Sequence, residues 1–313
     1  MKRCLVTGGA GFIGSHLAEA LLKRGDEVIV LDDFSTGKKE NITNLKKVPG
    51  KFTFIEASVL NSKAIREATY GVDVIFHQAA LGSVPKSLVD PLTYHEVNIH
   101  GTLKLLIAAK EAKVQRFVVA ASSSAYGETP ELPKRESMVP IPLSPYAVTK
   151  LAQEQYASAF AASYGMETVS LRYFNVYGPR QDPTSQYAAV IPSFFDHLIR
   201  GEPPQIYGDG EQTRDFTFVG DVVEANLKAA EIKDPKGGIF NIAGGKQISI
   251  NELATIIGKL VRSKLKPKYL PPRAGDIRHS VADISRAKKV LGWTPKTRLE
   301  DGLRIAHDWY NTK

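Results

Sequence analysis

Cysteine is almost absent from this sequence, since Cys4 is the only one among 313 residues. A single cysteine excludes an internal disulfide and any metal site built from several cysteines. Because Cys4 lies within an apolar run near the start of the chain, we interpret it as a small core residue rather than a reactive thiol.

Long hydrophobic runs are missing as well. No stretch approaches the ~18 consecutive apolar residues that a membrane-spanning helix needs. The first strand-like run begins as early as Lys2, so we expect no charged and apolar leader before the fold. These two observations predict a cytoplasmic protein that does not associate with membranes.

An excess of acidic residues is also absent, because 41 lysines and arginines against 33 aspartates and glutamates give a formal net charge of +8. The basic stretches Lys38–Lys39, Lys46–Lys47 and Lys259–Lys268 lack the interleaved aromatic residues of a single-strand binder and form no recognisable recognition helix. We therefore expect small anionic ligands and no nucleic acid. No metal is expected either, since His95 and His100 would point apart on a helix.

Apolar runs rich in Val, Ile and Phe alternate with longer helix-like stretches as far as about Tyr173. This alternation is typical of parallel strands joined by helical crossovers, and it predicts an α/β fold with a Rossmann-type doubly wound parallel sheet. The expected strands are Arg3–Thr7, Glu27–Leu31, Phe52–Glu56, Val74–His77, Phe117–Ala121 and Thr168–Tyr173. The expected helices are Phe12–Arg24, Pro91–Lys113 and Pro145–Tyr164.

Beyond about Gly178 the rhythm changes to proline-containing loops, short strands and helices near Gly220–Ile232 and Asn251–Arg262. We predict a first domain over residues 1–178 and a smaller α/β cap over residues 179–313. The chain is expected to cross back between the two parts near 215–245.

Three glycines, Gly8, Gly11 and Gly14, are spaced three apart between the first strand and the first helix. Gly8 permits the turn, Gly11 lets a ligand approach the backbone, and Gly14 lets helix and strand pack closely, as in a dinucleotide-binding loop. Asp32 follows at the end of the second strand, where a carboxylate can bind both ribose hydroxyls and repel a 2′-phosphate. These residues predict NAD, in preference to NADP, on the first domain.

Tyr146 and Lys150 lie one turn apart on an expected helix, in the segment Tyr-Ala-Val-Thr-Lys, and therefore share a face. There the ammonium can stabilise a phenolate that would otherwise form only near pH 10. The serines Ser122–Ser124 precede them at the end of the fifth expected strand, where open parallel sheets bind their ligands. Ser122 is our candidate for the hydroxyl beside the reacting oxygen.

With these motifs in order, the sequence resembles the extended short-chain dehydrogenase/reductase family, and within it the UDP-hexose 4-epimerases. The resemblance spans nearly the whole chain. It rests on TGGAGFIG at 7–14, HQAA at 77–80, SSSAYG at 122–127, YAVTK at 146–150, RYFNVYGPRQ at 172–181, TRDFTFVGD at 213–221 and RAGD at 273–276.

The resemblance implies a reaction in which Tyr146 removes the 4-hydroxyl proton of a UDP-hexose while the hydride at C4 passes to NAD. The resulting 4-keto sugar turns over and receives the hydride on its opposite face. It implies cofactor contacts from Gly8, Gly11, Phe12, Ile13, Gly14, Asp32, Asp33, Ser58, Val59, Ala79, Tyr146 and Lys150. It implies substrate contacts from Gly82, Ser83, Ser123, Ser124, Asn175, Ala189, Tyr207, Arg214, Arg273, Asp276 and Ser280.

Sugar choice rests on a finer resemblance to epimerases that accept N-acetylated hexosamines, carried by Gly82, Ser83, Ser123, Asn175, Ala189 and Ser280. The resemblance implies that Ser280 stands where a tyrosine closes the pocket in epimerases restricted to UDP-glucose and UDP-galactose. A small side chain there leaves room for a 2-acetamido group. We expect interconversion of UDP-GlcNAc and UDP-GalNAc, with some activity on UDP-glucose and UDP-galactose.

Three alternatives remain open: a UDP-glucose 4-epimerase proper, a UDP-glucuronate 4-epimerase, and a non-catalytic NAD-binding module. A nucleotide-sugar dehydratase is less well supported, because Ser123 and Ser124 stand where such enzymes place an acidic pair. The resemblance also implies a homodimer, paired through the helices near Pro91–Lys113 and Pro145–Tyr164.

Overall fold

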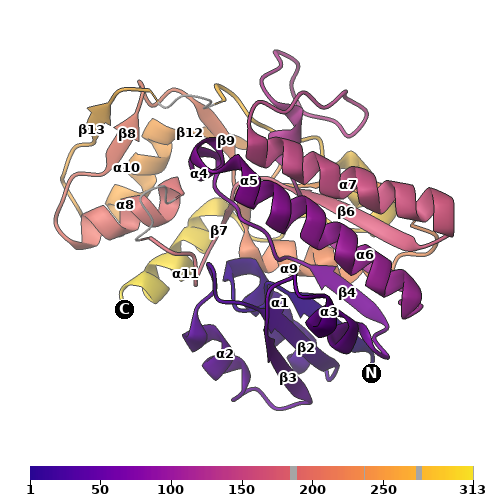
Figure 1. Cartoon of the computed structure of the whole chain (residues 1–313). Helices are drawn as coiled ribbons and strands as arrows, with labels where there is room; N and C mark the ends of the chain where they lie inside the picture. The colour runs from indigo at the N-terminus through magenta and orange to yellow at the C-terminus, as the bar shows by residue number, and fades with distance from the viewer. Residues whose placement is uncertain (184–188, 236, 273–276, 313) are drawn as a thin grey trace.

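A computed structural model describes residues 1–183, 189–235, 237–272 and 277–312. Its centre is a seven-stranded sheet in which every pair of neighbours is parallel (Figure 1). From edge to edge the strands are β11 (Gly238–Ile242), β6 (Glu167–Tyr173), β5 (Arg116–Ser122), β4 (Val74–His77), β1 (Arg3–Thr7), β2 (Glu27–Asp32) and β3 (Phe52–Glu56). The predicted α/β fold with a doubly wound parallel sheet is confirmed.

Helices cover both faces of this sheet because successive strand residues point to opposite sides. Cys4 and Val6 belong to one hydrophobic core, whereas Leu5 between them belongs to the other. The first core packs against α1 (Phe12–Lys23), α2 (Lys39–Leu45) and α9 (Val219–Ala229). The second packs against α3 (Ser62–Thr69), α6 (Gly101–Glu111) and α7 (Pro145–Tyr164).

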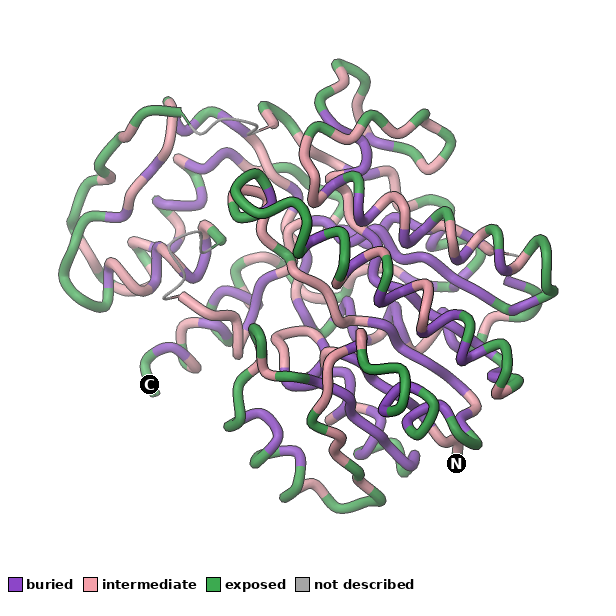
Figure 2. Tube along the Cα trace, in the orientation of Figure 1, coloured by how far each residue is buried: buried purple, intermediate pink, exposed green. Residues whose placement is uncertain are grey.

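Burial follows the same layers, since the strands are largely buried and the outer helix faces are exposed (Figure 2). Cys4 is fully buried, and desolvation raises the pKa of its thiol to about 12. An unreactive core residue is therefore the right interpretation of the single cysteine.

Shorter elements form the part of the molecule at the upper left of Figure 1, around a third hydrophobic core. Its helices are α8 (Val190–Ile199), α10 (Ile250–Leu260) and α11 (Leu299–Tyr310). Its two-stranded sheets pair β8 (Gln205–Tyr207) with β13 (Lys268–Leu270), β9 (Thr213–Asp215) with β12 (Gln247–Ser249), and β10 (Thr217–Phe218) with β7 (Val176–Tyr177).

The chain returns from this part to the main sheet, because α9 packs beside α1 and β11 pairs with β6. The boundary at residue 178 stays a prediction. A π-helical turn η3 (Ala287–Leu291) then precedes α11.

The helix α7 shows how local sequence sets its bounds. Ser144 is the N-cap and accepts a hydrogen bond from the Ala147 amide, Pro145 occupies the first turn, and Gly165 ends the helix with φ +66°. Proline at the start and a left-handed glycine at the end are the usual pair of helix boundaries. The predicted range Pro145–Tyr164 therefore agrees with the structure.

The helix predicted over Pro91–Lys113 is helical without a break from Pro91 to Glu111, but it contains a π-helical segment that the sequence did not indicate. That stretch follows a short helix α4 (Val84–Val89) and divides into α5 (Pro91–Tyr94), a π-helical segment η1 (His95–His100) and α6. The buried side chain of Asn98 explains the interruption, because it bonds both backbone polar groups of Leu81 and the hydroxyl of Thr149. A π-turn lets such a side chain leave the regular helical register.

Candidate active site

The predicted site residues follow the strands of the main sheet at one edge. Gly8 comes directly after β1, Asp32 ends β2, Ser122 ends β5, and Asn175 follows β6. Because all these strands are parallel, their carboxyl ends lie along the same edge, where open α/β sheets bind ligands.

The glycine loop between β1 and α1 is shaped by close backbone contacts. Gly8 has φ +70°, and a Cβ there would lie 2.6 Å from the Ala79 amide nitrogen. A Cβ on Gly14 would lie 2.1 Å from the Gly8 carbonyl oxygen. Only glycine fits either position, so the loop brings the start of α1 against the sheet.

The N-terminus of α1 carries no side-chain cap, since its N-cap residue is Gly11. The first-turn amides of Phe12, Ile13 and Gly14 can therefore bond a ligand, and the helix dipole favours an anion there. A cradle of this kind fits the pyrophosphate of a dinucleotide.

Asp32 is buried at the end of β2, and both of its carboxylate oxygens accept backbone N–H groups. The Ala10 amide donates to Oδ2 at 2.9 Å and the Phe34 amide to Oδ1 at 2.8 Å. Burial raises the pKa of Asp32, although these two hydrogen bonds lower it. The bonds fix the orientation of the carboxylate while leaving acceptor capacity for ribose hydroxyls.

Asp33 and Ser58 lie together at the next position along this edge. Burial acts to raise the pKa of Asp33, but hydrogen bonds from Ser35 and Ser58 outweigh it and hold the pKa below its usual range. Val59, buried beside Ser58, packs against Gly101 at the start of α6. These contacts place Asp33, Ser58 and Val59, three of the predicted cofactor contacts, next to one another.

The residues at this edge thus fit a dinucleotide cofactor: an uncapped helix N-terminus for its phosphates and an oriented carboxylate for a ribose. Such a group supplies a hydride acceptor beside the sheet. The protein's own part is to bind it, orient it and keep a base close to the reacting carbon.

Tyr146 lies in the first turn of α7, with its backbone amide donating to Ser87 Oγ at 3.1 Å. Its ring meets the Tyr94 ring edge-on, with centroids 6.4 Å apart. The phenol lies close enough to the Ser122 side chain for that side chain to act to lower its pKa. The structure therefore brings the predicted base and the predicted hydroxyl together, with the Tyr146 side chain still partly accessible.

Lys150 is buried one turn further along α7, and its Nζ donates to the Ala120 carbonyl oxygen at 2.8 Å. Burial lowers the pKa of Lys150 to about 7. Burial also raises the pKa of Tyr146, partly offset by the Ser122 side chain. Lys150 is not among the groups that shift the pKa of Tyr146 here, so the expectation that its ammonium stabilises a phenolate stays a prediction.

The serines after Ser122 lie within reach of it. Ser124 donates from its backbone amide at 3.2 Å and from its hydroxyl at 2.9 Å to Ser122 Oγ. Ser123 begins the 3₁₀ turn η2 (Ser123–Tyr126) and is partly accessible. Ser83 caps α4 by accepting from the Lys86 amide. Its hydroxyl is thus partly committed to a structural bond.

A second group of predicted residues gathers around β9. Asn175 Nδ2 donates to the Asp215 carbonyl oxygen at 2.9 Å, and the Ser280 amide donates to the Thr213 carbonyl oxygen at 3.2 Å. Arg214 lies between these two acceptors in the strand. Asn175, Arg214 and Ser280 are thus brought together, as the resemblance implies.

Gly82 and Ala189 have no polar side chain and can offer only space. Gly82 is exposed, with nothing within 4 Å of the position that a Cβ would take, and Ala189 is the N-cap residue of α8. Arg273 and Asp276 lie outside the described residues.

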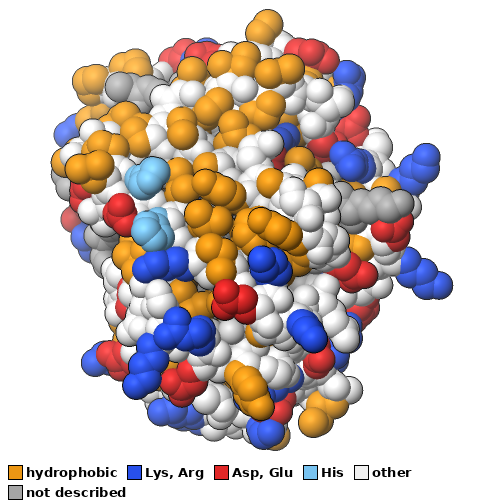
Figure 3. Space-filling model, turned by 45° about the vertical axis from the view of Figure 1, so that its right-hand side comes forward, with side chains coloured by type: hydrophobic (Ala, Val, Ile, Leu, Met, Phe, Trp, Pro, Cys, Tyr) orange, Lys and Arg blue, Asp and Glu red, His pale blue; other side chains and the backbone are white. Residues whose placement is uncertain are grey.

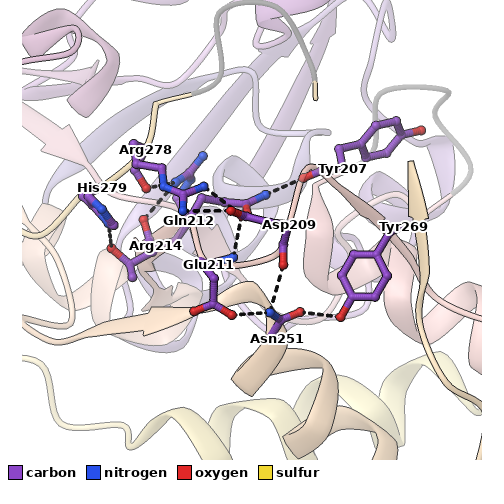
Figure 4. Close-up of polar contacts among 10 residues, drawn as sticks. Tyr207, Asp209, Glu211, Gln212, Arg214, Asn251, Tyr269, Arg278 and His279 are labelled. Carbon is purple, nitrogen blue, oxygen red and sulfur yellow. Dashed lines mark hydrogen bonds and ion pairs between the residues drawn. The ribbon is translucent and has the colours of Figure 1, made fainter. Parts of the chain in front are cut away.

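A pocket of about 580 Å³ opens beside this group. Its volume is in the range of small-molecule sites. Gln212 Nε2 donates to the Tyr207 carbonyl oxygen at 2.7 Å, and Arg278 forms a two-bond ion pair with Asp209 at 2.7 and 2.9 Å (Figure 4). The lining residues are Glu128, Tyr207, Gly208, Asp209, Gln212, Leu270, Pro272, Ile277 and Arg278.

Most of these lining residues were missed from the sequence, where only Tyr207 was named. The sequence does carry one signal for these lining residues, the Gly-Asp-Gly segment at 208–210. Both glycines have positive φ and form a tight turn that presents Asp209. Nothing in the sequence pairs Asp209 with Arg278, because they are far apart along the chain. Glu128 joins the pocket from the loop that follows Ser122–Ser124.

The described residues contain no group of three or more His, Cys, Asp or Glu side chains that could hold a metal ion. Over the same part of the chain, we find no helix with the length and hydrophobicity needed to cross a membrane.

The fold and the site together define a class of protein, a Rossmann-type enzyme that works with a bound dinucleotide. The features that define it are the glycine loop, the oriented carboxylate of Asp32, and the pair of Ser122 and Tyr146. Comparison with known proteins narrows the class. The model of the NAD-dependent epimerase/dehydratase family matches residues 4–243.

Relatives match over almost the full length. The UDP-glucose 4-epimerase of Mycolicibacterium smegmatis is 40% identical, with 99% of each chain covered. The UDP-glucuronate 4-epimerase of Thermodesulfobacterium geofontis is 38% identical, with 97% of this chain and 95% of the relative covered.

Among solved structures, the UDP-N-acetylglucosamine 4-epimerase of Methanobrevibacter ruminantium, in complex with UDP-N-acetylmuramic acid, superimposes with a TM-score of 0.95. It is 42% identical, with 99% of this chain and 98% of that chain covered. The chain therefore belongs to the NAD-dependent epimerase/dehydratase family. It is an epimerase, and NAD is its cofactor.

Proposed function

We propose that this protein is a UDP-sugar 4-epimerase that interconverts UDP-GlcNAc and UDP-GalNAc, with some activity on UDP-glucose and UDP-galactose. The observation that carries the reaction is the meeting of Tyr146 and Ser122 at the carboxyl edge of the sheet, beside the glycine loop. A non-catalytic NAD-binding module would need no such arrangement.

In the proposed reaction, Tyr146 takes the proton of the sugar 4-hydroxyl and gives it back once the 4-keto sugar has turned over. NAD, held at the glycine loop and Asp32, would accept the hydride from C4 and return it to the opposite face. Ser122 donates a hydrogen bond to the reacting oxygen, and buried Lys150 supports this end of α7 against β5. The net reaction is an inversion at C4.

The side chains at 123 and 124 support epimerisation rather than dehydration. Elimination of water needs an acid to protonate the leaving hydroxyl, whereas Ser123 and Ser124 have no such group in the physiological pH range. Both are partly accessible and close to Ser122. We assign them to the sugar pocket, with Gly82, Ser83 and Ala189.

The choice of an acetylated sugar rests on Ser280, held beside β9. A serine there leaves space that a tyrosine ring would fill. For the nucleotide we assign Arg214 and Arg273 to the diphosphate, where a planar guanidinium matches phosphate geometry, and Asn175 to the diphosphate or the sugar. We assign Tyr207 to the neighbourhood of the uracil and Asp276 to its ribose.

A second candidate substrate is UDP-glucuronate, favoured by the similarity to the UDP-glucuronate 4-epimerase named above. The excess of basic residues would suit a substrate with an added carboxylate. UDP-glucose with UDP-galactose as the sole pair is the third possibility. All three share the reaction and differ only in what surrounds the sugar.

The experiment is product chromatography after incubation of the purified protein and NAD with UDP-GlcNAc, UDP-glucose, UDP-glucuronate or a dTDP-hexose in separate reactions. Formation of UDP-GalNAc supports the whole proposal. Conversion of only UDP-glucose or only UDP-glucuronate keeps the reaction and overturns the argument from Ser280. No conversion of any substrate overturns the proposed function.

We further propose a homodimer formed through α6 and α7. Figure 3 turns the face with these helices toward the viewer and shows hydrophobic side chains gathered on it. Ile107 of α6 and Val148 of α7 are 41% and 48% exposed. Exposed apolar surface on neighbouring helices is typical of a protein interface. The cytoplasmic location expected from the sequence stays a prediction.

A further inference from the structure

Asp215, the last residue of β9, is fully buried and has no part in the reaction described above. Its carboxylate accepts backbone N–H groups from two other segments. The Gly245 amide lies 3.1 Å from both oxygens, and the Ala282 amide lies 3.1 Å from Oδ2.

These segments carry or flank the predicted substrate positions. Ala282 lies two residues after Ser280, and Gly245 lies in the turn between β11 and β12. The backbone of Asp215 makes the third link, because its carbonyl oxygen accepts Asn175 Nδ2 at 2.9 Å. Arg214 precedes it in the strand. One buried residue thus connects Asn175, Arg214 and the segment of Ser280.

The packing leaves little freedom around this carboxylate. A Cβ on Gly244 would lie 2.5 Å from the Phe216 carbonyl oxygen and 3.1 Å from Asp215 Oδ1. Burial raises the pKa of Asp215 to about 7, against the lowering effect of its amide donors. Above that pH the carboxylate is charged, and hydrogen bonds to a buried charge are among the stronger ones.

We propose that Asp215 is a positioning residue for the sugar nucleotide, holding the segment of Ser280 at a fixed distance from Arg214 and Asn175. This inference rests on the proposed function, since those three residues are assigned to the UDP-sugar there. Asp215 touches neither substrate nor cofactor in this account. It acts through the backbone that carries the contacting residues.

The test is Asp215→Asn, with KM and kcat measured at a pH of about 8 and UDP binding measured by calorimetry. The amide group keeps the shape of the carboxylate, but its NH₂ faces backbone N–H donors and cannot accept from them. We expect KM for UDP-GlcNAc and the dissociation constant of UDP to rise about tenfold or more. We expect kcat to change less than about threefold and the bound NAD to stay at the wild-type level, because the hydrogen bonds of Asp215 go to Gly245, Ala282 and Asn175 and not to Ser122 or Tyr146.

Asp221→Asn is the matched control. Asp221 is also buried, at 4% exposure, and also holds backbone amides: Lys296 N–H and Thr297 N–H, both at 3.1 Å. It anchors α9 to the segment before α11, away from the predicted substrate positions. We expect lower thermal stability with unchanged KM. A KM increase as large as that of Asp215→Asn would show a general packing effect and overturn the proposal.

A second variant covers the case in which Asp215→Asn does not fold. Ala282→Pro keeps the carboxylate and removes the N–H that donates to it, while its ring also fixes φ at this buried position; we expect KM to rise about threefold or more. Wild-type KM and UDP affinity in whichever variant folds would overturn the positioning role. The proposed function is tested separately, by the wild-type protein, and is overturned if that protein converts no UDP-sugar.

Discussion

Lys150 Nζ donates a hydrogen bond to the Ala120 carbonyl oxygen at 2.8 Å, and so joins the first turns of α7 to the end of β5. Tyr146 is carried by the same turns of α7, and Ser122 lies two residues after Ala120. The bond therefore links the two elements that bring the side chains of Tyr146 and Ser122 together.

Tyr146→Phe is expected to lower kcat by about 100-fold or more, the scale of a lost acid–base group. The ring and its edge-on contact with Tyr94 remain, so bound NAD and thermal stability should stay near the wild-type level. Stopped-time assays of UDP-sugar conversion with quantification of bound NAD would check this.

Tyr156→Phe is the control on the same helix, because Tyr156 packs against the second hydrophobic core beyond the site. It should leave kcat unchanged. Full activity in Tyr146→Phe would show that a residue other than Tyr146 is the catalytic base.

Gly14→Ala is expected to abolish NAD binding and lower the free energy of unfolding by about 3 kcal/mol, because the added Cβ would meet the Gly8 carbonyl oxygen at 2.1 Å. Fluorescence titration with NAD and urea unfolding would check both effects. Gly25→Ala is the control: Gly25 has φ +88° but no atom within 4 Å of a Cβ. It should lose only about 1 kcal/mol, through backbone strain, and bind NAD normally. Normal NAD binding by Gly14→Ala would contradict the close-packing argument.

The sheet and the glycine loop could be predicted from sequence because their signals are local. A buried parallel strand appears as a continuous apolar run, and the glycine spacing follows from the turn between β1 and α1. For this reason Arg3–Thr7, Phe52–Glu56 and Val74–His77 agree with the predicted bounds.

Features that depend on contacts between distant segments could not be predicted in the same way. The π-helical segment η1 exists because Asn98 reaches Leu81 and Thr149, and helical periodicity alone does not show this. The orientation of Lys150 toward Ala120 is of the same kind, as is the pairing of Asp209 with Arg278. The role proposed for Asp215 also depends on amides from two distant segments.

Ser280→Tyr is expected to lower kcat/KM for UDP-GlcNAc by about tenfold or more and to leave that for UDP-glucose within about threefold. The added ring would occupy the space assigned to the 2-acetamido group. Parallel kinetics with the two substrates would measure the ratio. Ser280→Thr, which adds only a methyl group to the hydroxyl side chain, should keep it near the wild-type value. An equal loss on both substrates would indicate general damage to the pocket and contradict the assignment of Ser280.

Ile107→Lys is expected to shift the proposed dimer toward monomer, because it would bury a charge in the interface of α6 and α7. Light scattering coupled to gel filtration would report the mass. Ile305→Lys is the matched control, since Ile305 is 47% exposed on α11 and lies outside the proposed interface. Unchanged mass in Ile107→Lys, or an equal shift in both variants, would argue against this interface.

Asp215→Asn should also change how stability depends on pH. Burial raises the pKa of Asp215 from 3.8 to about 7, so between these values the native state holds a proton that the unfolded chain has lost. The contribution of this group to the free energy of unfolding therefore falls as pH rises through that window. Asparagine has no such contribution, so the difference between variant and wild type should move in favour of the variant by up to about 1.4 kcal/mol per pH unit.

Urea unfolding of both proteins at several values between about pH 5 and about pH 8 would measure this difference, which should level off above about pH 8. Asp209→Asn is the control, because the pKa of Asp209 is shifted in the opposite direction: hydrogen bonding to Arg278 lowers it to about 2. Its stabilising contribution is lost only as pH falls from about 4 toward 2, so its difference from wild type should stay constant over the measured range. A constant difference for Asp215→Asn as well would mean that this buried carboxylate ionises at the same pH in the folded and unfolded chains.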